Sequence, residues 1–95
     1  MPKAIESKIV KDKIMSGSPR IAGTRIRVRD IAEKYIVMKE SPAIIAREFG
    51  ISISDVHEAL SFYYKNTEEI QEEIRKDREF VEKIRKELKH EILSR

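Results

Sequence analysis

Four arginines crowd into one short stretch of this 95-residue chain, GSPRIAGTRIRVRD at residues 17–30. Arg20, Arg25, Arg27 and Arg29 stand there with no acidic residue before the last letter. A guanidinium group binds a carboxylate or a phosphate through two parallel hydrogen bonds, which an ammonium group cannot do. The stretch therefore predicts an anion-binding arm. The simpler alternative is a strand whose polar face lies in water.

A second candidate site follows from the spacing of two short helices. A helix over 42–49, a turn at Gly50 and a helix over 53–65 have the spacing of a helix-turn-helix, whose second helix reads DNA bases. The outward residues of that second helix are Ser52, Ser54, Asp55, His57, Glu58 and Ser61. None of them is Arg or Lys, so most DNA affinity would have to come from the arginine arm. The predicted DNA-binding residues are Arg20, Arg25, Arg27, Arg29, Ser52, Ser54 and His57.

The C-terminal segment carries an apolar stripe at helical spacing. Its members step by three or four residues, as in a heptad repeat, with one polar break at Asp77: Ile70, Ile74, Val81, Ile84, Leu88 and Ile92. We expect the first turns, to Ile74, to fold back on the domain, and the rest to self-associate or to lie in another protein's groove. The predicted partner-binding residues are Ile74, Arg75, Arg78, Val81, Ile84, Arg85 and Leu88.

The stretch FYYKN at residues 62–66 holds half of the six aromatic residues. Helical periodicity sends Tyr63 inward and leaves Phe62 and Tyr64 to cover a neighbour. Because aromatic residues are enriched at the cores of interfaces, Phe62 and Tyr64 are the predicted dimer contacts. Packing against the last helix is the alternative for one or two of them.

These residues require a mainly α fold: an N-terminal β arm or hairpin, a trihelical helix-turn-helix domain and a long C-terminal amphipathic helix. We expect a strand at Ile9–Val10, and the alternation over 25–29 predicts another extended segment. The expected parts are 1–29, the β arm with its arginine-rich turn; 30–66, the helix-turn-helix core; and 67–95, the amphipathic helix.

Helix boundaries are marked by capping residues. The first helix is expected to run from Asp30 to about Lys39, with an inward stripe of Ile31, Ala32, Tyr35, Ile36 and Met38. Ser41 and Ser52 are predicted N-caps, with Pro42 at the first helical position and Asp55 completing a capping box. Gly50 is predicted to end the second helix in the left-handed conformation. Asn66 and Glu69 predict another capping box that opens a helix ending near residue 93.

Charge and composition narrow the classes of function. The formal net charge is only +3, with 12 basic and 8 acidic residues in 1–66 against 8 and 9 in 67–95, so the positive excess belongs to the first two thirds. No cysteine is present, which excludes disulfides and thiolate metal sites. The chain is also rich in Lys, Glu and Ile, a composition typical of proteins from thermophiles. With no signal peptide visible around Lys3 and Glu6, we expect a cytoplasmic protein.

Enzyme motifs are not apparent. No Gly-Lys-Ser/Thr closes a P-loop after Gly23, and the His-Glu pairs at His57 and His90 lack the second histidine of a zinc site. We therefore expect no enzyme, no cofactor and no metal.

Two stretches together resemble a known family, domain-of-unknown-function family 433 (DUF433). They are GSPRIAGTRIRVRDI and SPAIIAREFGISISDVHEALSFYYKNTEEI. The resemblance covers about residues 9–74, and its positions in this chain are Gly17, Pro19, Ile21, Gly23, Thr24, Arg25, Ile26, Val28, Tyr63 and Tyr64. Ser18 departs from the pattern, because many relatives carry Lys or Arg at that position. Since Arg25 lies in the signature, we expect it to brace the fold, while Arg20, Arg27 and Arg29 remain freer to bind an anion.

Members of this family look like VapB-type antitoxins with a helix-turn-helix, commonly paired with a PIN-like ribonuclease toxin. The resemblance implies that the chain neutralises such a nuclease and binds its own promoter DNA as a homodimer. Two alternatives remain: a stand-alone helix-turn-helix transcriptional regulator, and an interaction adaptor that binds no DNA.

Overall fold

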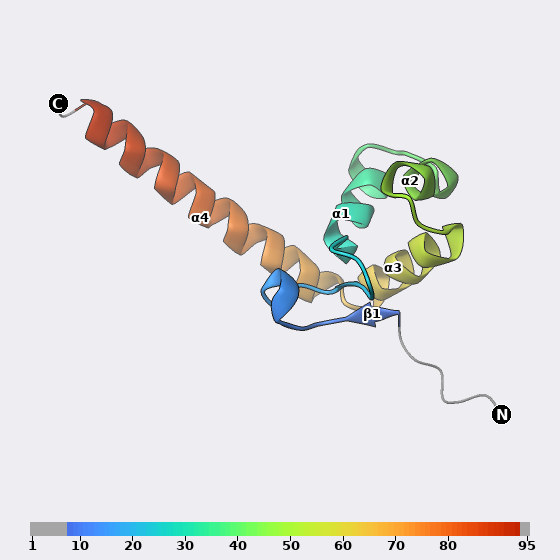
Figure 1. Cartoon of the computed structure of the whole chain (residues 1–95). Helices are drawn as coiled ribbons and strands as arrows, with labels where there is room; N and C mark the ends of the chain where they lie inside the picture. The colour runs from blue at the N-terminus through green and yellow to red at the C-terminus, as the bar shows by residue number, and fades with distance from the viewer. Residues whose placement is uncertain (1–7, 94–95) are drawn as a thin grey trace.

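The computed structural model describes residues 8–93, which form a small body and one long projecting helix (Figure 1). Residues 1–7, on which the expectation of no signal peptide largely rests, lie outside the described residues. The predicted mainly helical fold with a short N-terminal hairpin is confirmed. The elements in order are β1 (Ile9–Val10), η1 (Lys13–Met15), β2 (Arg20–Ile21), α1 (Val28–Ala32), η2 (Glu33–Val37), α2 (Pro42–Phe49), α3 (Ile53–Lys65) and α4 (Thr67–Leu93).

The N-terminal hairpin pairs β1 with β2 in antiparallel register, with Ile9 opposite Ile21. The strand expected at Ile9–Val10 is confirmed, but the extended segment expected over 25–29 is wrong at its end, because Val28 and Arg29 already belong to α1. Asp30 explains this early start: its carboxylate accepts a hydrogen bond from the Arg27 N–H and so supports the first helical turn.

The first helix changes its geometry after one turn. α1 continues directly into η2, a π-helical turn over Glu33–Val37. The wider turn shifts the angular position of the residues that follow it. The predicted inward stripe therefore holds for Ile31 and Ala32, which are buried, and is wrong for Tyr35, Ile36 and Met38, which are exposed.

Helices α2 and α3 begin and end where the capping residues predict. The Ser41 hydroxyl accepts a hydrogen bond from the Ile44 N–H, and the Ser52 hydroxyl accepts one from the Asp55 N–H. Gly50 ends α2 with a φ of 71°, the left-handed conformation that costs glycine little. The capping box expected at Asn66 and Glu69 is different: the Asn66 amide donates to the Phe62 carbonyl and so closes α3.

The hairpin and helices α1 to α4 share one apolar core. Its buried side chains come from β1, β2, α1, α2, α3 and the start of α4, whereas η1 and η2 contribute none. The buried apolar residues are Ile9, Ile21, Val28, Ile31, Ala32, Ile45, Ala46, Val56, Ala59, Leu60, Tyr63 and Ile70. The inward position predicted for Tyr63 is confirmed, and Ile70 joins the start of α4 to the core.

The long helix α4 leaves the body beyond Asp77 and gives the molecule its elongated shape, with extents of 66 × 27 × 23 Å. Figure 1 shows its later turns running away from all other elements. No helix within residues 8–93 combines the length and the apolar character needed to cross a membrane.

Candidate functional site

Arg20 is a structural residue of the hairpin. Only 6% of it is exposed, and its guanidinium grips the Asp12 carboxylate with two hydrogen bonds, Nε–Oδ1 at 3.1 Å and Nη2–Oδ2 at 2.5 Å. A third hydrogen bond of 2.8 Å runs from Nη1 to the Thr24 carbonyl. The hydrogen bond with Arg20 lowers the pKa of Asp12. The expectation that Arg20 is free to bind an anion is therefore wrong, because its donors are already used inside the fold.

Arg27 is held at the start of α1. Its Nε and Nη2 atoms each lie 3.1 Å from an oxygen of Asp30, and this hydrogen bonding raises the pKa of Arg27. The pair spans one helical turn and remains partly exposed. The Arg27 guanidinium can therefore bind an anion only if it also keeps its hydrogen bonds to Asp30 or gives them up.

Arg29 connects the body to α4. Its Nη1 atom lies 2.6 Å from Asp77 Oδ2 and 3.2 Å from Glu73 Oε2, and the Ser18 hydroxyl donates to the same Glu73 oxygen. The polar break at Asp77 in the apolar stripe thus has a partner on α1. This four-residue clasp fixes the direction in which α4 leaves the body.

Arg25 is the exposed arginine of the arm. Among residues 8–93 it has no hydrogen bond or ion pair, and it follows Gly23, whose φ of 80° makes the preceding turn. We expected Arg25 to brace the fold and Arg20 to be accessible, and the two roles are exchanged. The signal was Asp12, eight residues before Arg20, whose pairing across the hairpin the sequence alone did not reveal.

The predicted DNA-facing side of α3 is exposed at Ser54 and His57, while the Ser52 hydroxyl is used as a cap. The acidic residue Asp55 is neutralised by Lys8, whose Nζ lies 3.2 Å away. Arg47 at the end of α2 is exposed and has no ion pair within the described part of the chain. Lys8 and Arg47 were missed because they lie outside α3 in the sequence.

The two predicted dimer residues lie in different surroundings. Phe62 is partly buried and packs against the core, whereas Tyr64 is 59% exposed. Tyr64 also contacts Tyr63 edge-on, with ring centroids 5.3 Å apart. Of these two residues, Tyr64 is the one that offers a substantial aromatic surface to a partner.

The apolar stripe of α4 divides into two halves at Asp77. Ile70 is fully buried and Ile74 packs against the core, as expected for the first turns. Val81 and Leu88 are 51% and 54% exposed, and Ile84 and Ile92 are exposed as well. The outer half of α4, residues 78–93, therefore carries an apolar face that the described body does not cover.

A groove of about 840 Å³ lies between α4 and the α1–η2 segment. It brings together most of the predicted partner-binding residues, namely Ile74, Arg75, Arg78, Val81 and Arg85, with Arg27 and Arg29 of α1. Ile84 and Leu88 lie outside it. The sequence did not reveal the opposite wall, Ile36 and Val37, because their exposure depends on the π-helical turn.

The arginines on α4 differ in their availability. Arg75 pairs with Glu72 and Glu79, and Arg85 Nη1 lies 3.0 Å from Glu82 Oε2. Arg78 is exposed and has no ion pair or hydrogen bond among residues 8–93. Arg78 thus has a guanidinium without a partner in this part of the chain, at the edge of the groove.

A cluster of charges joins η2 to α2. Lys34 Nζ lies 3.0 Å from Glu48 Oε1 and 5.5 Å from the centre of the Phe49 ring. The neighbouring Glu48 carboxyl raises the pKa of Glu40, and Glu40 and Lys34 together lower the pKa of Glu48. Within residues 8–93 no group of three or more His, Cys, Asp or Glu side chains is arranged to hold a metal ion.

Comparison with known proteins adds one relationship. Residues 9–63 match the DUF433 family, described as a protein of unknown function. The match ends within α3 and leaves α4 outside it. No curated protein and no solved structure matches the chain.

Proposed function

The chain belongs to the DUF433 family, and from that premise we propose that it is a cytoplasmic antitoxin that neutralises a PIN-like ribonuclease and binds its own promoter DNA as a homodimer. One observation carries the first activity. The outer half of α4 projects from the body with an exposed apolar face, and Arg78 beside it has no ion pair within the described residues 8–93. An amphipathic helix of this kind binds by laying its apolar face into a partner's groove.

Arg78 gives this helix a chemical target. PIN-like nucleases hold Mg²⁺ in a cluster of carboxylates, and Mg²⁺ keeps several water ligands in such sites. A guanidinium presented to those carboxylates forms bidentate hydrogen bonds and displaces the metal or its water. Arg75 and Arg85 are already paired along α4, so Arg78 is the arginine that binds without first breaking a contact.

DNA binding is proposed for the α2–α3 pair, acting as a helix-turn-helix with Gly50 at the turn. Ser54 and His57 supply polar contacts, and Lys8 cancels the charge that Asp55 would otherwise present to the phosphates. Phosphate attraction comes from two exposed arginines without partners among residues 8–93, Arg25 and Arg47. Arg25 was already among the residues predicted to bind DNA; Arg47 is added, and Arg20 is removed because its donors are used inside the fold.

The antitoxin proposal is tested by co-purification with the product of the adjacent gene, followed by an RNase assay. We expect a stable complex with suppressed nuclease activity, and we expect deletion of 78–95 to abolish suppression. Arg78→Ala should weaken suppression more than Arg85→Ala does, because Arg85 is engaged with Glu82. Full suppression by the truncated chain contradicts the proposal.

The DNA proposal has an independent test in the salt dependence of binding to the promoter. Each lost phosphate contact lowers the logarithmic salt slope by about 0.9. Arg25→Ala should reduce the slope by that amount in each subunit, and Arg20→Ala should act through stability instead. An equal slope for wild type and Arg25→Ala refutes the assignment, and no binding at all favours the adaptor function. Binding to the promoter without any nuclease complex favours the stand-alone regulator.

A further inference from the structure

The outer half of α4 carries an apolar face that the rest of residues 8–93 does not cover. Val81, Ile84, Leu88 and Ile92 continue the face that begins with the buried Ile70, but they are exposed. The last ion pair between α4 and the body within residues 8–93 is Arg29–Asp77. No Gly or Pro interrupts α4, so the helix has no site at which to bend back.

The same chain leaves a second apolar surface open. Ile36 and Val37 of η2 are exposed and form the wall of the groove that faces α4. This wall lies beside the point where the stripe of α4 becomes exposed at Val81. The two surfaces are continuous, and a helix that covers one also touches the other.

We propose that the outer half of α4 pairs antiparallel with that of a second copy of this chain, and that its last turn lies in the second copy's groove. The inference concerns the free protein and does not rest on the antitoxin proposal. Each copy then covers the other's exposed stripe and the η2 wall. The contact uses the same surface on both copies and closes as a two-fold dimer.

The body decides the direction of pairing. It lies on the stripe face of α4 at Ile70 and Ile74, the face that a partner helix must approach. A parallel partner would bring its own body into the same space. An antiparallel partner carries its body at the far end, where Figure 1 shows nothing beside α4.

The same obstruction sets the register. The second helix must end beyond Asp77, which Arg29 already occupies. Placing Leu93 of the second copy level with Glu79 aligns about 21 Å of helix, at 1.5 Å per residue. In this register Ile84 of one copy faces Leu88 of the other.

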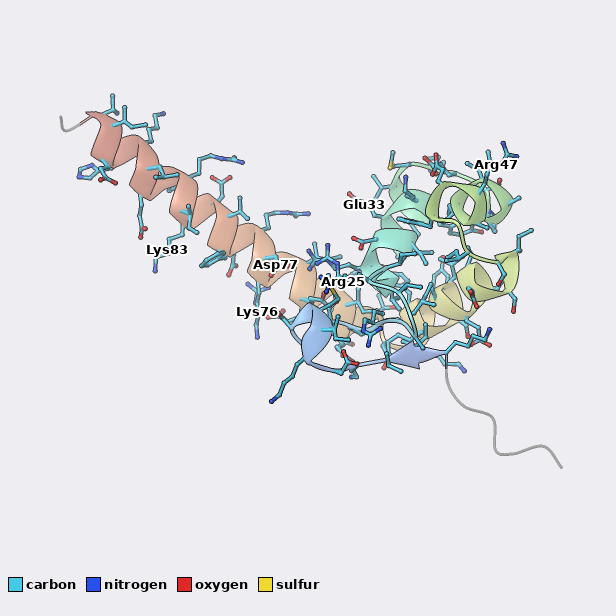
Figure 2. All side chains as sticks on the ribbon, viewed as in Figure 1. Arg25, Glu33, Arg47, Lys76, Asp77 and Lys83 are labelled. Atoms are coloured by element: carbon cyan, nitrogen blue, oxygen red, sulfur yellow. The ribbon has the colours of Figure 1, made fainter. Side chains whose placement is uncertain are left out.

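One carboxylate of the groove, that of Glu33, fits this placement. Glu33 is exposed, has no ion pair within residues 8–93 and lines the groove. In Figure 2 it lies on the edge of the body nearest the outer half of α4. In the antiparallel dimer, Lys89 of the second copy lies beside that copy's apolar stripe and on the side of Glu33 of the first copy. The two residues then form an intermolecular ion pair.

Oligomeric state gives the first test. Size-exclusion chromatography with light scattering should give twice the chain mass of 11.1 kDa at tens of micromolar protein. Leu88→Glu should yield the monomer, while Lys83→Glu, on the side of α4 that Figure 2 shows pointing away from the body, should keep the dimer. Circular dichroism checks that both variants keep their helices. A monomeric wild type, or equal dissociation by both variants, overturns the proposal.

Cysteine cross-linking tests the register, because the chain contains no cysteine of its own. A mixture of Ile84→Cys and Leu88→Cys chains should form disulfide-linked dimers faster than either variant alone. A parallel pair would link each variant to itself most rapidly. That result, or rapid linking of Tyr64→Cys chains on α3, refutes the antiparallel α4 dimer.

Discussion

Replacement of Arg20 separates structural arginines from those available to ligands. Arg20→Met keeps much of the side-chain volume but removes two hydrogen bonds to Asp12 and one to the Thr24 carbonyl. Hydrogen bonds to charged groups contribute about 1.5–3 kcal/mol each. Because Asp12 is 43% exposed and regains water, we expect a net loss of about 3 kcal/mol in the free energy of unfolding.

Thermal unfolding followed by circular dichroism measures this loss. For a domain of this size, about 1 kcal/mol moves Tm by about 4–8 °C, so Arg20→Met should lower Tm by on the order of 15 °C. Arg25→Met is the matched control, because Arg25 is exposed and without a partner among residues 8–93. Its Tm should stay close to that of the wild type.

The pH dependence of stability is a second test of the ion pair between Arg20 and Asp12. The Arg20 hydrogen bond lowers the pKa of Asp12 below its ordinary value of 3.8. Stability from the ionised carboxylate is therefore present above that value and is lost as the pH falls through the lowered pKa. The difference in Tm between wild type and Arg20→Met should therefore become smaller in acid. An unchanged Tm for Arg20→Met, or an equal fall for Arg25→Met, refutes this account.

Four further perturbations follow from the fold and the proposals. Ile70→Ala, at a fully buried site, should lower the free energy of unfolding by about 2–5 kcal/mol in chemical denaturation. A loss as small as that of a surface substitution would contradict the role of Ile70 in the core. Gly50→Ala, at a φ of 71°, should cost about 1–2 kcal/mol; a higher Tm would contradict the strain. The pKa of Glu40 is raised by the neighbouring Glu48 carboxyl, so the stability from protonated Glu40 is lost as the pH rises through that pKa. Glu40→Gln should therefore be more stable than wild type at neutral pH and not in acid, and the opposite order would refute the raised pKa of Glu40. Titration with the nuclease should convert the proposed homodimer into a mixed complex in light scattering, whereas a persistent homodimer within the complex would mean that the two partners use different surfaces.

Local sequence signals predicted the helices whose ends are set by capping residues. Ser41, Gly50 and Ser52 act through neighbours within a few positions, so α2 and α3 were correct from end to end. The π-helical turn η2 was not predictable in this way. Its residues repeat like an ordinary α-helix in sequence, and only the three-dimensional structure exposes Ile36 and Val37.

The candidate site was harder to predict because ion pairs join residues far apart in the chain. The arginine-rich arm was recognised, but the availability of each arginine depends on Asp12, Glu73 and Asp77. Residue type identified the chemistry, and tertiary contacts determined which members remain open to a ligand.

The projecting outer half of α4 also makes one part of the chain more sensitive to proteolysis than the rest. Its ion pairs join residues of the same helix, such as Arg85 and Glu82, and a helix without tertiary packing lacks the main source of helical stability in proteins. Local opening there requires little of the free energy that unfolds the core. A protease that meets a free monomer will therefore cut within 78–93 first and leave the folded body behind. Such a cut removes the proposed partner-binding surface and leaves the proposed DNA-binding surface intact. A partner bound to α4 would protect it from the protease, and so would determine how long partner binding and DNA binding remain on one molecule.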